Sequence, residues 1–371
     1  MTEVIRGEGA LAQVLSGLPA EDCVILGGEK SFGASGASEM AAPLLGAGAR
    51  HFTVHGPLPT GAEVDRLVHA MGVSVPAVIV GVGGGLVLDT AKLVSLSVAT
   101  GQSSEELVKK GVVNSHRPPA VILAPTTAGS GAERTPFAVV YMDGVKYSVD
   151  DARLKPSLAV LDAMLVRSAP RPVAAASALD AIAHCVESMW ACRSTTESRE
   201  LAANSLSRLA ANIERAVLED DESARREMLY AASDAGEAIS RTRTTAAHAL
   251  SYHLTSRYGV AHGHAVALTL GQVAVFNEQV DESSLSDPRG VAHVRSVLGE
   301  ICETFGVSDA MHLAGRLRDL IQSFGLPADV DAAIATPIDR RLWVSEVNVE
   351  RLANNPRMLD QDDLLDLVSR S

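Results

Sequence analysis

Four side chains in the second half of the sequence could together bind one divalent metal ion. Asp180 and His184 are four residues apart in a helical pattern, so both project from one helix face, about 5–6 Å apart. His248 and His262 could supply two further ligands. One carboxylate and three imidazoles suit Fe(II), Zn(II) or a related ion and leave coordination positions for a substrate oxygen. Taken singly, however, each histidine is more often a hydrogen-bonded core or surface residue than a ligand.

A glycine-rich segment in the first half of the sequence is typical of a phosphate-binding loop. Gly83, Gly84 and Gly85 lie where a predicted strand ends and a predicted helix begins. Glycines at that place let a diphosphate approach backbone N–H groups at the positive end of the helix. Asp89 could accept a hydrogen bond from a ribose or nicotinamide group, or only stabilise the helix dipole. The spacing differs from GxGxxG, so this segment alone is a weak indication.

A second segment, residues 125–133, is rich in glycine and hydroxyl side chains and directly follows another predicted strand. Ligands of open α/β sheets bind at the carboxyl ends of the strands, so this segment could form another wall of the same site. The alternative is an ordinary turn, which the same residue types favour.

Length and charge limit the classes of protein to consider. With 371 residues the chain exceeds the size at which one hydrophobic core keeps growing, so we expect two domains. A net charge of -13 argues against nucleic acid or an anionic membrane as partner, because both require an excess of lysine and arginine. The first residues do not resemble a signal peptide, and the four cysteines lack CxxC spacing. We therefore expect a cytoplasmic protein with a small-molecule partner.

The elements that must position these residues follow from the hydrophobic pattern. Strands are expected at 23–26, 51–54, 77–82, 120–123 and 158–161, helices at 38–45, 62–71 and 87–97, and a hairpin at 137–141 and 146–149. Asp143-Gly144 suits the hairpin turn. After residues 169–172 the pattern predicts successive helices. We predict a doubly wound, Rossmann-like α/β domain, 1–168, followed by an all-α helical domain, 169–371.

The order of these motifs along the chain resembles that in the iron-dependent, or group III, alcohol dehydrogenases. This family is related more distantly to dehydroquinate synthase and glycerol dehydrogenase. The resemblance covers nearly the whole chain, through segments 4–10, 83–92, 125–133, 180–187, 248–263 and 354–357. It implies the dehydroquinate synthase-like fold, an oxidoreductase that uses NADH or NADPH with Fe(II) or Zn(II), and a homodimer formed through edge strands of the first domain.

The resemblance also implies roles for individual residues. The metal ligands would be Asp180, His184, His248 and His262. The residues along the cofactor would be Gly83, Gly84, Gly85, Leu86, Asp89, Thr126, Thr127, Ser130 and Lys146.

Departures from the family pattern affect the cofactor and the proton donor. Leu86 and Ala132 stand where members often carry serine, which removes two possible hydroxyl contacts. Many members have a second histidine four residues after the first histidine of this region, where this chain has Tyr252 and, one position later, His253. The proton could therefore come from water, a ribose hydroxyl, His253 or His264.

Cofactor choice is also open at the sequence level. Glu29 follows the strand whose end discriminates against a 2′-phosphate in the family and could exclude NADP. Lys30 and Ser31, directly after it, could instead favour NADP.

Substrate choice rests on Arg241 and Thr244, seven and four residues before His248. On a continuous helix both would share its metal-facing side and could bind an anionic group. This run is similar to that of phosphonoacetaldehyde reductases, which implies reduction of a small, anionic aldehyde. Arg241 could equally pair with Glu237. The alternatives are a dehydroquinate synthase-type lyase, a dehydrogenase acting on a neutral or carboxylated substrate of the glycerol or maleylacetate type, and a non-catalytic binding protein.

Overall fold

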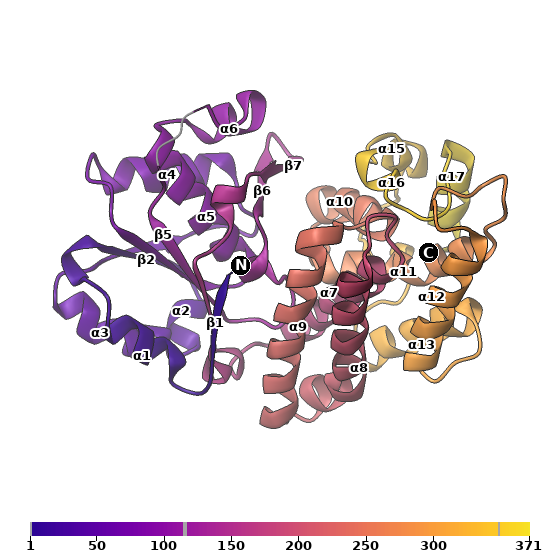
Figure 1. The fold of residues 1–371 in the computed structure, drawn as a ribbon, viewed down its shortest axis with the longest axis horizontal. Helices are drawn as coiled ribbons and strands as arrows, with labels where there is room; N and C mark the ends of the chain where they lie inside the picture. Colours follow the sequence, from indigo (N-terminus) through magenta and orange to yellow (C-terminus); the bar gives the residue numbers. More distant parts are fainter. Residues whose placement is uncertain (1, 114–116, 348) are drawn as a thin grey trace. The chain divides into compact units, whose positions relative to one another are not determined.

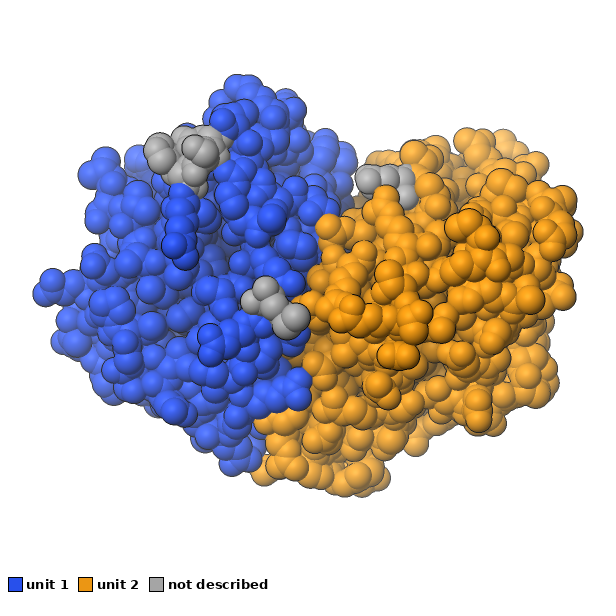
Figure 2. Space-filling view, in the orientation of Figure 1, with its two compact units in different colours: residues 1–169 blue, residues 170–371 orange. Residues whose placement is uncertain are grey.

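A computed structural model describes residues 2–113, 117–347 and 349–371 of the chain. The chain divides into two compact units, Met1–Ala169 and Pro170–Ser371, which are coloured separately in Figure 2. The first unit combines a sheet with helices and the second is helical (Figure 1), which confirms the predicted fold class.

The first unit contains a six-stranded parallel sheet with the order β1-β8-β5-β4-β2-β3. Its strands are β1 (Glu3–Arg6), β2 (Cys23–Gly28), β3 (Arg50–Val54), β4 (Val78–Gly83), β5 (Ala120–Pro125) and β8 (Leu158–Leu161). The chain runs from β2 outward to β3, then returns to β4 on the other side of β2. In open α/β sheets, ligands bind outside the carboxyl ends of the strands at such a reversal, here between β2 and β4.

Helices cover both faces of this sheet (Figure 1). They are α1 (Ala10–Ser16), α2 (Ser31–Ala34), α3 (Ala37–Gly46), α4 (Gly61–Met71), α5 (Gly85–Thr100) and α6 (Ser104–Lys110). Val24 and Leu26 of β2 pack in one apolar cluster with α4 and α5, whereas Cys23 and Ile25 pack in another with α1 and α3. Both faces of the strand are buried, which explains its uninterrupted apolar run.

The predicted hairpin is present as β6 (Phe137–Met142) and β7 (Val145–Asp150), which pair antiparallel. Asp143 and Gly144 both have positive φ, 51° and 78°, as a tight hairpin turn requires.

The edge strand β1 was not predicted, because its four residues are only partly buried and include charges at both ends. Strands β2, β4 and β5 end at Gly28, Gly83 and Pro125, one or two residues beyond the predicted ends, since glycine and proline also indicate turns.

The second unit is built from helices in the part of the chain that the structure describes. These are α7 (Arg171–Trp190), α8 (Thr196–Leu218), α9 (Glu222–Thr242), α10 (Ala246–Tyr258), α11 (His262–Glu278), α12 (Val291–Thr304), α13 (Ala310–Ser323), α14 (Val330–Ala333), α15 (Arg340–Ser345), α16 (Val349–Leu352) and α17 (Gln361–Arg370). Helix α7 packs against α8, α9, α11 and α12 and is buried along nearly its whole length. None of the described helices combines the length and hydrophobicity needed to span a bilayer.

Candidate functional site

The central helix α7 presents three titratable side chains from one face. Asp180, His184 and Glu187 follow at intervals of four and three residues, so they stack along the same side of the helix. All three are buried. Charged groups in a helical core are costly unless other groups compensate them, so this face marks a site that the surrounding helices must complete.

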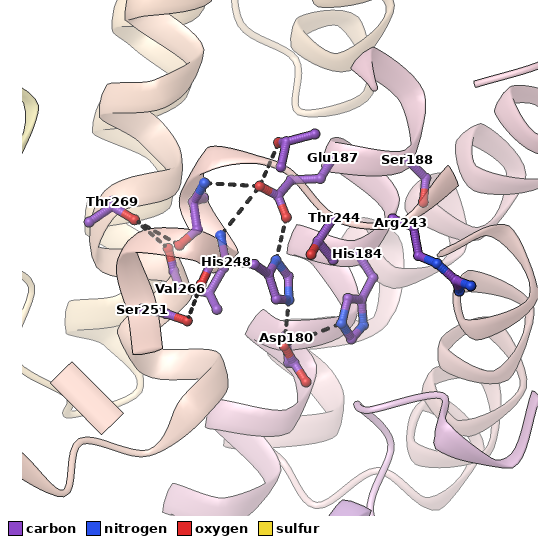
Figure 3. A network of polar contacts seen from close by, with 12 residues as sticks. Asp180, His184, Glu187, Ser188, Arg243, Thr244, His248, Ser251, Val266 and Thr269 are labelled. Carbon is purple, nitrogen blue, oxygen red and sulfur yellow. Dashed lines mark hydrogen bonds and ion pairs between the residues drawn. The ribbon is translucent and has the colours of Figure 1, made fainter. Parts of the chain in front are cut away.

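Helices α10 and α11 complete it. Asp180, His248 and His262 each offer one ligand atom, and these three atoms lie within 4.8 Å of one another. Oδ1 of Asp180 is 3.4 Å from Nε2 of His248 and 3.6 Å from Nε2 of His184. The ring of His184 stacks on that of His248, with centroids 4.8 Å apart (Figure 3). The structure thus brings the four predicted ligands together; we call them the ligand group.

Two buried atoms of the ligand group have unused hydrogen-bonding capacity. Within the described residues, neither Oδ1 of Asp180 nor Nε2 of His248 has a hydrogen-bond partner. Leaving such an atom buried and unsatisfied costs about 1–3 kcal/mol. A carboxylate oxygen and imidazole nitrogens that converge in this way fit a divalent cation of the Fe(II) or Zn(II) type.

The neighbouring histidines keep Asp180, the carboxylic acid of the ligand group, in its charged form. Burial alone would raise the pKa of Asp180, but the adjacent His184, His248 and His262 outweigh burial and bring that pKa well below its usual range. Asp180 is therefore a carboxylate at neutral pH, the form in which it can bind a cation.

Glu187 fixes the orientation of one ring in the ligand group. Its wholly buried carboxylate accepts hydrogen bonds from the Thr245 hydroxyl at 2.7 Å, the Ala247 backbone N–H at 2.9 Å and Nδ1 of His248 (Figure 3). Because Nδ1 is held by this carboxylate, Nε2 of His248 is directed at Asp180 and is the ring nitrogen available to a cation. The complete burial of Glu187 agrees with a role in orienting His248 and not with that of a surface acid.

Gly263 allows the start of α11 to approach α7. A Cβ on this residue would lie 2.0 Å from the carbonyl oxygen of Ala176 and 2.6 Å from Cβ of Asp180. Only glycine permits that distance, so the residue after His262 determines how closely its imidazole can approach the carboxylate.

The histidines considered as proton donors have other partners. Nδ1 of His253 contacts Glu346 at 2.7 Å, and Nε2 of His264 contacts the carbonyl oxygen of Pro327 at 2.7 Å. Tyr252 instead stacks on His262, with ring centroids 6.2 Å apart. The structure therefore brings Tyr252 to the ligand group and gives His253 and His264 different surroundings.

The helical argument that placed Arg241 beside the metal is wrong. Helix α9 ends at Thr242, Arg243 has φ 64° and ψ 174°, and α10 begins only at Ala246. This backbone region is essentially restricted to glycine, so the sequence gives no sign of the break.

The break separates the two predicted substrate residues. Arg241 pairs with Glu197 at 2.8 Å and with Glu237 at 3.4 Å, so its charge is already compensated, as the alternative interpretation held. Thr244 is buried and belongs to the polar network drawn around His248 and His184 (Figure 3).

In the first unit, the two glycine-rich segments adjoin one another. The backbone N–H of Thr126 donates to the carbonyl of Gly83 at 2.9 Å. A Cβ built on Gly84 would lie 3.5 Å from Oγ1 of Thr127, and one on Gly85 would lie 3.1 Å from Cβ of Ser130. Both segments therefore line the carboxyl ends of β4 and β5, beside the reversal in strand order.

Asp89 has a structural role in addition to any contact with a cofactor. One carboxylate oxygen lies 2.8 Å from Nζ of Lys92 and the other accepts the backbone N–H of Val139 at 3.0 Å. Lys92 is wholly buried and also donates to the carbonyls of Ala132 and Phe137. This pair joins α5 to the end of the second glycine-rich segment, a role for Lys92 that the spacing did not indicate.

The remaining predicted cofactor residues flank these segments. Leu86, in the first turn of α5, packs against the apolar cluster beneath it. Lys146 lies on β7 opposite Tyr141. Glu29 directly follows β2, and its exposed carboxylate is 3.8 Å from Nδ1 of His55 after β3.

Two family models together match nearly the whole chain. The family model for iron-containing alcohol dehydrogenases matches residues 1–163, and the model for their C-terminal part matches residues 174–371. A phosphonoacetaldehyde reductase from Streptomyces viridochromogenes is 37% identical over 299 residues, 77% of this chain and 74% of that protein.

Solved structures show the same fold. A sulfoacetaldehyde reductase from Bifidobacterium kashiwanohense, in complex with NAD+, superposes with a TM-score of 0.87 at 25% identity and covers 100% of this chain and 96% of its own. An iron-containing alcohol dehydrogenase from Thermotoga maritima has a TM-score of 0.84 at 24% identity, with 100% and 97% covered.

Proposed function

The chain belongs to the iron-containing alcohol dehydrogenase family, and we propose that it uses NADH to reduce phosphonoacetaldehyde, a two-carbon anionic aldehyde, to 2-hydroxyethylphosphonate. The observation that carries the proposal is the convergence of Asp180, His248 and His262 on one point, with His184 against them. Two relatives named for aldehydes with an anionic group, a phosphonate and a sulfonate, support the substrate class.

In this proposal the ligand group holds Fe(II) or Zn(II). When bound, the cation supplies the Lewis acidity that polarises a carbonyl, and reduced nicotinamide supplies the hydride. Asp180 contributes the negative charge, and Glu187 keeps Nε2 of His248 aimed at the ion. The N-terminus of α5, with Gly84 and Gly85, binds the diphosphate of the cofactor through backbone N–H groups.

The proton that completes the alcohol is assigned to water or a ribose hydroxyl of the cofactor. Burial raises the pKa of the Tyr252 hydroxyl, so this group stays protonated at neutral pH and can donate a hydrogen bond to the substrate. We do not assign the proton transfer to His253 or His264, because Nδ1 of His253 contacts Glu346 and Nε2 of His264 contacts the carbonyl oxygen of Pro327, outside the ligand group.

We propose NADH rather than NADPH because Glu29 lies at the carboxyl end of β2, next to the reversal in strand order. A carboxylate there binds ribose hydroxyls and repels a 2′-phosphate. We also propose a homodimer that forms through an edge strand of the sheet, β1 or β3, to be tested by light scattering of the purified protein.

The experiment for the main proposal is an assay of the protein reconstituted with Fe(II) or Zn(II). It measures NADH consumed and 2-hydroxyethylphosphonate formed from phosphonoacetaldehyde, with propionaldehyde as a neutral comparison. One alcohol per NADH is expected. A lyase of the dehydroquinate synthase type would regenerate its cofactor, and a binding protein would consume none, so absence of net NADH oxidation with every aldehyde would refute the proposal.

A further inference from the structure

A basic residue from the C-terminal part of the chain reaches the ligand group through a tyrosine. Arg351 lies on the short helix α16, which packs against α10. The polar side chains around the hydroxyl of Tyr252, on α10, include those of Arg351 and Thr244. We call this guanidinium and the two hydroxyls the Arg351 cluster.

The Arg351 cluster adjoins the ligand group through Tyr252. The ring of Tyr252 stacks on His262 at a centroid distance of 6.2 Å, with the planes inclined by 26°. Thr244 is buried and belongs to the polar network drawn around His248 and His184 (Figure 3). A molecule whose carbonyl reached the ligand group could extend its other end to these donors.

The backbone at Thr244 is rigidly held. The side-chain amide of Asn354 donates to the carbonyls of Thr242 at 2.9 Å and Thr244 at 3.1 Å. Between them, Arg243 adopts a conformation that costs about 1–3 kcal/mol for a residue other than glycine. Asn354 also lies only three residues from Arg351, so one short segment positions both the guanidinium and the threonine.

We propose that Arg351, with the hydroxyls of Thr244 and Tyr252, binds the anionic group of the aldehyde; this inference rests on the proposed function. A guanidinium offers two parallel N–H donors that match a phosphonate, and hydroxyls donate to the remaining oxygen. Arg241, which the sequence suggested, faces the carboxylates of Glu197 and Glu237, whereas Arg351 lies on α16, which packs against the helix that carries Tyr252 and His248.

The test compares Arg351→Met with Arg241→Met as a matched control, because both remove one guanidinium from the same unit. The readout is the ratio of kcat/KM for phosphonoacetaldehyde to kcat/KM for propionaldehyde. Two charge-assisted hydrogen bonds predict that this ratio falls about 100-fold in Arg351→Met and stays within about threefold in Arg241→Met. Arg351→Lys keeps the charge without the paired donors and should fall between wild type and Arg351→Met.

A second readout is independent of turnover. Calorimetry of 2-hydroxyethylphosphonate binding to the metal-loaded protein with NAD+ should show about 100-fold weaker binding for Arg351→Met, at unchanged metal content. An unchanged ratio, or equal losses on both aldehydes, would overturn the assignment of Arg351. Turnover of propionaldehyde without preference for the anion would also overturn it while leaving carbonyl reduction intact, whereas a wild-type protein inactive on both aldehydes would refute the proposed function.

Discussion

The Glu187 carboxylate holds Nδ1 of His248, and the opposite nitrogen of that ring lies 3.4 Å from Oδ1 of Asp180. A buried acid on one side of an imidazole and an unsatisfied carboxylate on the other define the direction in which the ring can bind a cation. Partners of this kind orient metal-binding histidines and raise their basicity.

Glu187→Gln should weaken metal binding about 10–100-fold, because the amide orients His248 less strongly and adds no basicity to it. Competition with a chelator measures the effect. Glu346→Gln is the matched control, since Glu346 also contacts Nδ1 of a histidine, His253, but outside the ligand group. Equal metal affinities in the two variants would argue against the orienting role of Glu187.

Gly263→Ala should destabilise the second unit by about 1–3 kcal/mol or more, because its Cβ would overlap the carbonyl of Ala176. Metal content should fall as well, since the start of α11 must move away from Asp180. The control is Gly299→Ala in α12, where a Cβ meets nothing within 4 Å and alanine favours the helix. Thermal melts with metal analysis would contradict the packing argument if both variants behaved alike.

Lys92→Met should cost about 3–5 kcal/mol of stability, since it leaves the Asp89 carboxylate without its buried partner. Denaturant unfolding measures this loss, and NADH affinity should decrease with it because the segments that Lys92 joins line the predicted cofactor site. Lys109→Met removes an exposed pair with Glu105 and should leave stability nearly unchanged, because water screens exposed charges. A loss of unfolding free energy in Lys92→Met as small as that in Lys109→Met would show that the buried pair does not stabilise the protein.

Glu29→Ala should raise the ratio of kcat/KM for NADPH to that for NADH about tenfold or more, because a like charge no longer faces the 2′-phosphate. Initial rates with both cofactors give the ratio. Glu39→Ala on α3 removes another exposed carboxylate and serves as the control. An unchanged ratio of the two kcat/KM values in Glu29→Ala would show that residues other than Glu29 determine the cofactor preference.

Much of the fold could be predicted because it depends on local patterns. Buried parallel strands give apolar runs such as 23–26, and Asp143-Gly144 supplies the two positive φ values of a hairpin turn. The four predicted ligands could be proposed from residue types and their order along the chain. Strand β1 was missed because an edge strand of four residues carries too little hydrophobic pattern.

The surroundings of the site could not be read in this way, because they depend on contacts between distant segments. The end of α9 at Thr242 is determined by Arg243, whose backbone conformation has no sequence signature outside glycine. Arg351 and Thr244 are more than a hundred positions apart in the sequence, yet both are among the polar side chains around Tyr252. The sequence does not distinguish Lys92 from the other residues of α5, because its buried acceptors, the carbonyls of Ala132 and Phe137, lie on another segment.

The central claim is that one divalent cation is bound by Asp180, His184, His248 and His262. Anomalous diffraction from crystals grown with Fe(II) or Zn(II), supported by metal analysis, tests it directly. The account predicts one ion per chain within bonding distance of these side chains, and loss of both the ion and aldehyde reduction in His262→Ala. An ion bound elsewhere, or a His262→Ala protein that keeps its metal and its full activity, would contradict it.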